Sequence, residues 1–446
     1  MNQNQEVIKS ESASPIVFEK LRLPTLVGLI IANMIGAGVF TTSGFALADL
    51  GSSNRVMLAW ALGGIIAFCG ALSYGGLVRH FTESGGEYLF LSCALHPLAG
   101  FIAGWVSLLA GFTGAIAFAA LAFETYLSPL IPFTLPPKVL AISLIVIAAL
   151  LHGARVRAGV GIQNAVVFLK FALIIIFIAG AFFAAKIIGD DSAIPSEPEF
   201  SLTAFAGSLV WISLSYSGFN AAVYVAGEAR DARRVVPRAM WVGTLIVTIL
   251  YLILNSIFVY LVPFEAIVGR EDVAAIAAQS IGGQSLALLV RAIIALSLLT
   301  SVFAMIMIGP RVYAKMAEDK VFPALFRFQG DVPRAAIALQ AVVAITVVAF
   351  STLKNLLSYL GFTLSLSAAL TVFCLFLIPK AESQSVKIPG YSFAPALFVG
   401  ATVFLASLAV WRNPAELIAT FLTVLSGITL YFILKHRNKV DSDDKI

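Results

Sequence analysis

The chain has 446 residues, of which 60% are hydrophobic and 12% charged, and its formal net charge is +5. A soluble globular protein is about half apolar and a quarter charged, so this composition excludes a soluble protein and predicts a polytopic membrane protein. The basic residues cluster at the ends of apolar segments rather than on one face, which excludes a nucleic-acid partner.

The cysteines and histidines give no sign of a cofactor. The three cysteines have no paired spacing and no ligand-rich surroundings, and the four histidines share no ligand spacing. We therefore expect inert cysteines, no disulfide, no metal site and no cofactor.

The N-terminal segment is polar and lacks the basic region and the cleavage site of a signal peptide. We expect it to be retained as a cytoplasmic tail, 1–22. A single transmembrane domain, 23–435, and a short cytoplasmic tail, 436–446, follow it.

Twelve apolar segments are long enough to be considered as membrane spans, which need about 20 mostly apolar residues each. The fourth and ninth are short. In chain order the segments are 25–48, 56–78, 98–127, 138–154, 160–185, 203–227, 239–262, 285–309, 334–350, 355–379, 391–411 and 414–434.

The distribution of basic residues predicts the orientation of these spans. If the N-terminus is cytoplasmic, 21 of the 29 Lys and Arg residues lie in cytoplasmic segments and six lie in outer loops. Such a bias is what the positive-inside rule requires, so both termini are expected on the cytoplasmic side. The lack of a targeting extension fits a bacterial inner membrane.

Glycine and polar residues interrupt the first and sixth spans. Gly36-Ala37-Gly38 in the first span is on its own also typical of a close helix contact. The sixth span contains the polar stretch 213–220, in which Gly218 lies 182 residues after Gly36. Matched interruptions in two halves are typical of inverted-repeat transporters.

We therefore expect a five-plus-five inverted repeat with broken first and sixth helices, followed by two extra helices at about 391–434. The first repeat would cover about 25–185 and the second about 203–379. A broken helix offers free N–H groups to an anion and free carbonyls to a cation. This pairing suits a zwitterion.

Six motifs in this order resemble the amino acid–polyamine–organocation (APC) transporter superfamily. The resemblance covers most of the chain and implies an amino acid permease with this inverted-repeat fold. The motifs are Gly36-Ala37-Gly38; Glu83-Ser84-Gly85-Gly86-Glu87-Tyr88; Gln163 with Lys170; Tyr216-Ser217-Gly218-Phe219-Asn220; Tyr224-Val225-Ala226-Gly227-Glu228 with Val236-Pro237-Arg238-Ala239; and Pro310-Arg311-Val312-Tyr313-Ala314-Lys315-Met316-Ala317-Glu318-Asp319.

The resemblance also implies a substrate-binding site at the two breaks. The substrate carboxylate would meet N–H groups of Gly36, Ala37 and Gly38, and the amine would meet carbonyls near Ile35, Ser215 and Tyr216. Beside Gly218, the substrate side chain would point toward Ser217, Phe219, Asn220 and Met305.

Two departures from the family bear on the substrate. The common Gly-Ser-Gly reads Gly-Ala-Gly here, so Ala37 offers no hydroxyl. Arginine/agmatine antiporters of the family carry a glutamate and a tryptophan where this sequence has Asn220 and Met305. With no carboxylate in the sixth-span break, we expect a neutral amino acid.

Two basic residues, Lys170 and Arg291, lie inside spans, where a charge costs about 2.5–3.5 kcal/mol. By resemblance, the Lys170 amine ties the fifth span to the first near Gly36, in the place of a sodium ion. It is either a titrating coupling group or a fixed cation. Arg291 lies near the outer end of the eighth span and is expected to snorkel to the interface.

Two further residues are gate candidates on the cytoplasmic side. Tyr88 belongs to the segment that resembles the family's inner gate. Glu228 ends the sixth span before three arginines. It predicts either a gate-side ion-pair network or a solvated helix end.

Proton-coupled symport is the expected mode, with amino acid exchange as the alternative. Lys170 disfavours sodium symport, although Ser297, Thr300 and Ser301 supply hydroxyls on the eighth span. Outside transporters, a sensor with a transporter fold would keep the same site. An intramembrane enzyme would need a nucleophile–base pair or metal ligands inside the spans, and the sequence shows neither, so we do not expect an enzyme. A passive channel is disfavoured because broken helices indicate a binding site rather than a continuous pore. The expected partners are an amino acid, the lipid bilayer and protons; the oligomeric state is open.

Overall fold

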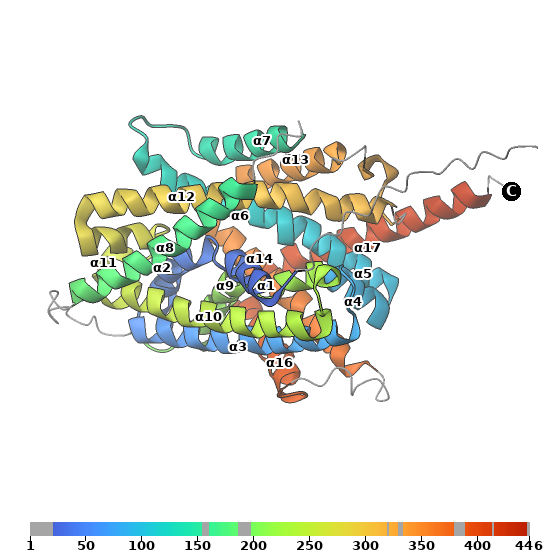
Figure 1. Cartoon of the computed structure of the whole chain (residues 1–446), viewed down its shortest axis with the longest axis horizontal. Helices are drawn as coiled ribbons and strands as arrows, with labels where there is room; N and C mark the ends of the chain where they lie inside the picture. Colours follow the sequence, from blue (N-terminus) through green and yellow to red (C-terminus); the bar gives the residue numbers. More distant parts are fainter. Residues whose placement is uncertain are drawn as a thin grey trace, which may run out of the picture.

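The computed structural model describes residues 21–153, 160–185, 198–318, 321–328, 333–378, 389–412 and 414–443. Helices make up nearly all of these residues (Figure 1). Within the described ranges, the only β-type pairing is one isolated bridge between Leu21 and Ala229. The predicted all-α polytopic membrane protein is confirmed.

The helices match the expected spans in order. A bent pair, α1 (Leu23–Met34) and α2 (Gly38–Leu50), forms the first span, with an angle of 41° at the break. Eight further segments are long and apolar enough to cross a membrane, and three shorter apolar helices complete the set. The eight are α3 (Ser53–His80), α5 (Pro97–Val106) continued by η1 (Ser107–Gly114) and α6 (Ala115–Leu127), α9 (Leu202–Tyr216) continued by η3 (Ala221–Glu228), α10 (Ala232–Tyr260), α12 (Val273–Glu318), α14 (Leu353–Phe373) continued by η5 (Cys374–Phe376), α16 (Phe393–Arg412) and α17 (Pro414–Asp443); the three are α7 (Val139–Gly153), α8 (Val160–Ala185) and α13 (Arg334–Phe350).

Local signals fix several helix starts. Ser52, Ser201 and Thr352 precede α3, α9 and α14, and each side chain accepts a backbone N–H from the first turn. Such caps satisfy donors that a helix start otherwise leaves unpaired. Short polar segments therefore end one span and begin the next.

The two interrupted helices lie in the middle of the bundle. α1 packs against α10 and α2 packs against α9, while α3 and α14 flank α9 (Figure 1). Two short helices mark the ends of the bundle: α4 (Gly86–Ala94) at the end where α3 stops, and α11 (Phe264–Ile267) at the end where α10 stops. We refer to these as the α4 end and the α11 end.

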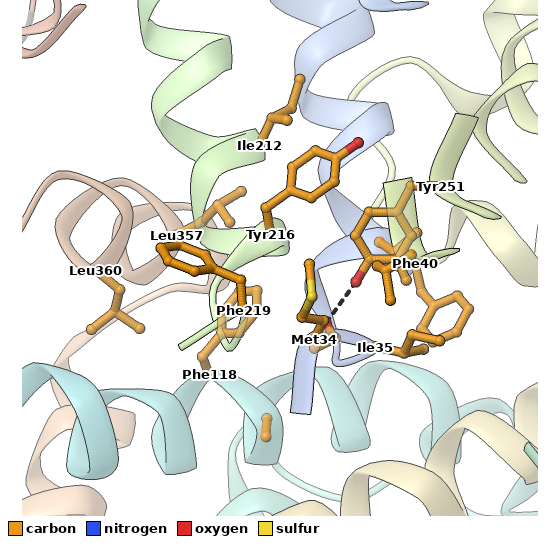
Figure 2. Close-up of a cluster of buried hydrophobic side chains, with 14 of the residues drawn as sticks. Met34, Ile35, Phe40, Phe118, Ile212, Tyr216, Phe219, Tyr251, Leu357 and Leu360 are labelled. Atoms are coloured by element: carbon orange, nitrogen blue, oxygen red, sulfur yellow. Dashed lines mark hydrogen bonds between the residues drawn. The ribbon is translucent and has the colours of Figure 1, made fainter. Parts of the chain in front are cut away.

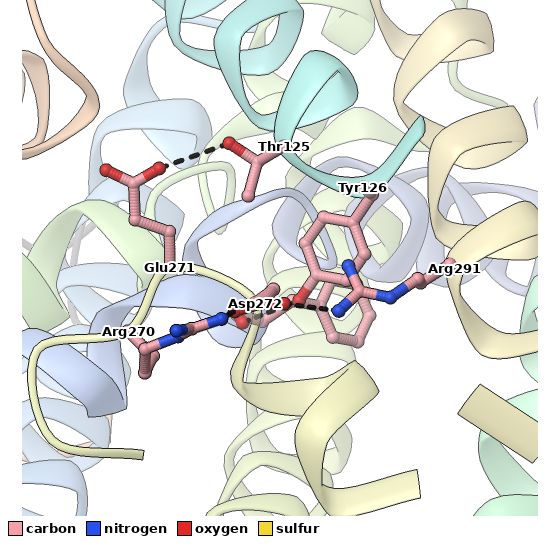
Figure 3. Close-up of polar contacts among 7 residues, drawn as sticks. Thr125, Tyr126, Arg270, Glu271, Asp272 and Arg291 are labelled. Carbon is pink, nitrogen blue, oxygen red and sulfur yellow. Dashed lines mark hydrogen bonds and ion pairs between the residues drawn. The ribbon is translucent and has the colours of Figure 1, made fainter. Parts of the chain in front are cut away.

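Arg291 corrects one expectation at the α11 end. It does not snorkel; its guanidinium pairs with Asp272, and the two side chains are 13% and 8% exposed (Figure 3). The loop 269–272 folds over α2, where the amide of Gly269 donates to the carbonyl of Gly44 at 2.8 Å. Because this loop carries Asp272 back onto α12, Arg291 finds its partner inside the protein.

Candidate substrate-binding site

The two breaks lie directly against each other. A Cβ atom at Gly38 would lie 2.5 Å from the hydroxyl oxygen of Ser215 on α9. A Cβ atom at Gly218 would lie 2.9 Å from the carbonyl carbon of Asn33 on α1, and Gly218 has φ +102°, which side chains disfavour. The Thr42 and Ser215 hydroxyls also bond at 2.9 Å across this contact. Glycine at these positions therefore lets the two helices meet where both are interrupted.

The start of α2 supplies donors for an anion. Among the described residues, the backbone N–H groups of Ala37 and Gly38 have no hydrogen-bond partner, whereas the N–H of Gly36 donates to Met34. Both residues lie inside the protein, at the positive end of the α2 dipole. This arrangement is suited to a buried carboxylate.

The ends of α1 and α9 supply carbonyl oxygens, and a tyrosine lies between them. The hydroxyl of Tyr251 on α10 lies 2.6 Å from the carbonyl of Met34 (Figure 2) and 3.0 Å from that of Ser215. Because a hydroxyl has one proton, it cannot satisfy both carbonyls fully. The remaining lone pairs can accept from an ammonium group. Tyr251 was not singled out by the sequence, since nothing local distinguishes it from other tyrosines in a span.

Lys170, on α8, also binds the first break. Its side chain is 5% exposed, and its amine donates to the carbonyl of Ile35. A small cavity beside it is lined by apolar side chains, with Lys170 and Ser297 as its polar members. The hydroxyls of Thr300 and Ser301 donate to the carbonyl of Ser297 in their own helix.

Aromatic side chains surround the breaks. The Tyr216 ring packs against Trp60 and Tyr251, with centroids 5.7 and 5.1 Å apart, and its hydroxyl donates to the carbonyl of Trp60. The Phe219 ring lies between Tyr74 and Phe398, with centroids 5.5 and 6.2 Å apart. These side chains form walls around the site, while the breaks offer backbone groups.

Two further predicted residues, Ser217 and Met305, are only partly buried. Ser217 is partly exposed, and its amide donates to Leu214 at 3.0 Å. Met305, on α12, is partly buried at the margin of the main core.

The α4 end holds a buried carboxylate that had no assigned role. Glu87 is 7% exposed and accepts hydrogen bonds from Tyr74, from Asn220 at 3.2 Å and from Ser367 at 3.0 Å. Burial raises the pKa of the Glu87 carboxyl, and the hydrogen bonds from its three donors lower it by less. In sequence, Glu87 appeared only as one letter of a motif, since its partners lie on distant segments.

Glu87 belongs to a row of contacts that we name the α4 seam, between 84–87 and 220–227. The Gly227 amide donates to the Ser84 hydroxyl at 3.0 Å. A Cβ atom at Gly86 would lie 2.3 Å from the ring of Tyr224, so this ring packs onto bare backbone. With the bond from Asn220 to Glu87, the seam ties the start of α4 to the second half of the broken sixth span.

The two gate candidates lie beside this seam rather than in it. The ring of Tyr88 lies near Gly104 of α5. The Glu228 side chain is exposed, and its backbone carbonyl accepts the amide of Leu21 at 2.9 Å.

Comparison with known proteins assigns the family. The family model described as amino acid permease matches residues 21–434. The chain belongs to this family of permeases. The permease is 26% identical to the large neutral amino acids transporter small subunit 2 of Mus musculus, over 95% of this chain and 83% of that protein.

Two further relatives also match over most of both chains. The permease is 24% identical to the serine/threonine exchanger SteT of Bacillus subtilis, over 92% of this chain and 95% of that protein. It is 25% identical to the b(0,+)-type amino acid transporter 1 of Mus musculus, over 91% and 85%. The permease is therefore an integral membrane protein that transports amino acids.

Proposed function

We propose that the permease moves neutral amino acids across the membrane by alternating access, binding the substrate backbone at the two facing breaks. The observation that carries this proposal is the pairing of donors and acceptors at one place. Free N–H groups begin α2, and carbonyls that Tyr251 and Lys170 only partly satisfy end α1 and α9. A zwitterion is complementary to both.

A neutral side chain is favoured by the groups at the sixth break. A carboxylate does meet the sixth-span break, because Asn220 donates a hydrogen bond to Glu87. However, Glu87 is buried and already accepts three hydrogen bonds, so a cationic substrate would have to displace one of its donors. The names of two relatives, a large neutral amino acids transporter and a serine/threonine exchanger, also support this choice.

Proton-coupled symport is the proposed mode, and exchange is the second candidate. Exchange is favoured by the relative SteT, which is named a serine/threonine exchanger, and by Lys170, whose amine bonds to a carbonyl and so fits a fixed cation. The proposed orientation has the α4 end in the cytoplasm of a bacterium, because Arg79, Arg233, Arg234 and Arg238 gather there around one hollow.

Uptake by purified protein in proteoliposomes tests this function. Labelled serine, leucine and lysine are offered to empty and to preloaded vesicles, with and without an inward proton gradient. Accumulation of serine or leucine in empty vesicles only with the gradient is the expected result. Uptake confined to preloaded vesicles would establish exchange instead. Preferential lysine transport would overturn the neutral substrate, and binding without any transport would indicate a sensor.

A further inference from the structure

The Glu87 carboxyl joins four parts of the bundle at one point. It lies on α4, its donors Tyr74 and Ser367 lie on α3 and α14, and Asn220 lies in the sixth-span break. Through Asn220 it is one hydrogen bond away from the proposed substrate site. Any movement of η3 away from α4 must break the bond between Asn220 and Glu87.

No cation neutralises this carboxylate in the part of the chain that the structure describes. Among the described residues, no Lys, Arg or His side chain pairs with Glu87, and its contacts are hydroxyl and amide groups. A buried carboxylate without a cation is unfavourable in its ionised form, so such a group tends to bind a proton. When water reaches it, the ionised form becomes favourable again.

We propose that Glu87 carries the coupled proton: it holds the proton while the α4 seam is closed and releases it when the seam opens to the cytoplasm. This inference rests on the proton symport proposed above. The proton binds to a Glu87 carboxyl oxygen from water on the outer side of the membrane and leaves to water on the cytoplasmic side. One proton therefore crosses the membrane in each cycle, and no other group needs to change its charge.

The direction of the coupling follows from the burial of Glu87. Burial raises the pKa of this carboxyl in the closed state, so protonation stabilises the closed seam. Opening hydrates the carboxyl, its pKa falls toward the ordinary value, and the proton leaves. A higher cytoplasmic pH consequently favours opening.

Other titratable groups near α4 do not take over this role. The phenols of Tyr74 and Tyr224 face Glu87 from α3 and η3, and as acids with ordinary pKa near 10 they stay neutral near pH 7. Cys374 lies on η5, which packs against α4. On α14, Tyr359 bonds to Thr423, and Lys354 lies over Trp211.

The Glu87→Gln variant in proteoliposomes tests the proposal. With the membrane potential clamped, a gradient of about two pH units should accumulate a substrate coupled to one proton about 100-fold, since each pH unit corresponds to about 1.4 kcal/mol. We expect this in the wild type. Glu87→Gln should lose the accumulation yet still exchange substrate in preloaded vesicles, because an amide can keep hydrogen bonds but cannot release a proton.

Two controls make the result specific. Glu416→Gln removes another buried carboxylate, on α17, and should accumulate substrate like the wild type. Glu87→Asp keeps a titratable group and should retain gradient-driven uptake at a reduced rate. Wild-type accumulation by Glu87→Gln would overturn the proposal. A wild type indifferent to the gradient would instead overturn the proposed symport itself.

A second variant keeps the proposal testable if Glu87→Gln does not fold. Ser367→Ala removes a donor that lowers the pKa of Glu87. The pH at which uptake falls to half its maximum should therefore be higher in Ser367→Ala than in the wild type. A shift downward, or no shift, would contradict the assignment.

Discussion

The two interrupted helices are held in opposite ways. At the first break, a cation, Lys170, binds a backbone carbonyl, and the following half-helix is a regular, buried α2. At the sixth break, the carboxyl of Glu87 accepts a hydrogen bond from the side chain of Asn220, and the following half, η3, is a 3-10 helix with one non-helical residue. Lys170 thus holds the first break through a backbone carbonyl, whereas Glu87 holds the sixth through a side chain.

This difference separates two tasks. Every amino acid has a carboxylate and an amine. Backbone atoms can bind these two groups, and no substitution removes the backbone atoms. Side chains at the sixth break can vary without disturbing them. A permease can therefore keep one recognition of the substrate backbone while its side-chain specificity and coupling change through residues such as Asn220 and Glu87.

The largest expected effect comes from separating the two breaks. Gly218→Ala places a methyl group 2.9 Å from the Asn33 carbonyl carbon at φ +102°. Overpacking of this kind costs about 1–3 kcal/mol, and the left-handed backbone about 1–2 kcal/mol more. We expect transport to fall at least about tenfold and the melting temperature to drop.

Gly28→Ala is the matched control for this variant. It lies in α1 with no atom within 4 Å of the new methyl group. Alanine also favours a helix, so stability should stay equal or rise. Equal transport by both variants would show that the contact between the breaks is dispensable.

A smaller loss is expected when the cation of the first break is removed. Lys170→Met keeps the length of the side chain and deletes the hydrogen bond to Ile35. A charged hydrogen bond contributes about 1.5–3 kcal/mol, which corresponds to about 10- to 100-fold in uptake rate. Lys170→Arg should retain part of the activity. Wild-type uptake by Lys170→Met would mean that the first break needs no cation.

The smallest effect should follow from Tyr251→Phe, which removes the hydroxyl between Met34 and Ser215. A neutral hydrogen bond contributes about 0.5–1.5 kcal/mol, or about two- to tenfold in the KM for the substrate. Tyr260→Phe, whose hydroxyl bonds to Asn54 at the α11 end, should leave the KM unchanged. If both variants behave alike, Tyr251 does not order the carbonyls.

The sequence predicted those features that depend on neighbouring residues. Among the described residues, apolar length located nine spans, counting the bent pair as one, and three shorter apolar helices, and glycine with polar residues located both breaks, because hydropathy and helix propensity act locally. The family resemblance further implied that Lys170 lies near Gly36, and its amine binds Ile35. That the substrate binds at these residues remains a prediction.

Long-range partners were beyond sequence reasoning. Asn220 and Glu87 are 133 residues apart, and Tyr251 and Met34 are 217 residues apart. The expectation for Arg291 was wrong because it considered one helix, whereas Asp272 arrives on a folded loop. Which distant polar groups meet depends on the packing of whole helices, which no local pattern reports.

Each half of the chain supplies the segment that covers the broken helix of the other half. The loop 269–272, from the later half, lies on α2, and the α4 segment, from the earlier half, lies on η3. During synthesis, α4 therefore emerges before η3, which it covers, while α2 stays uncovered until the loop 269–272 follows. The α4 end can close only after η3 has been synthesised, and the α11 end only after the loop 269–272, so the nascent first half passes through a stage in which neither end is covered.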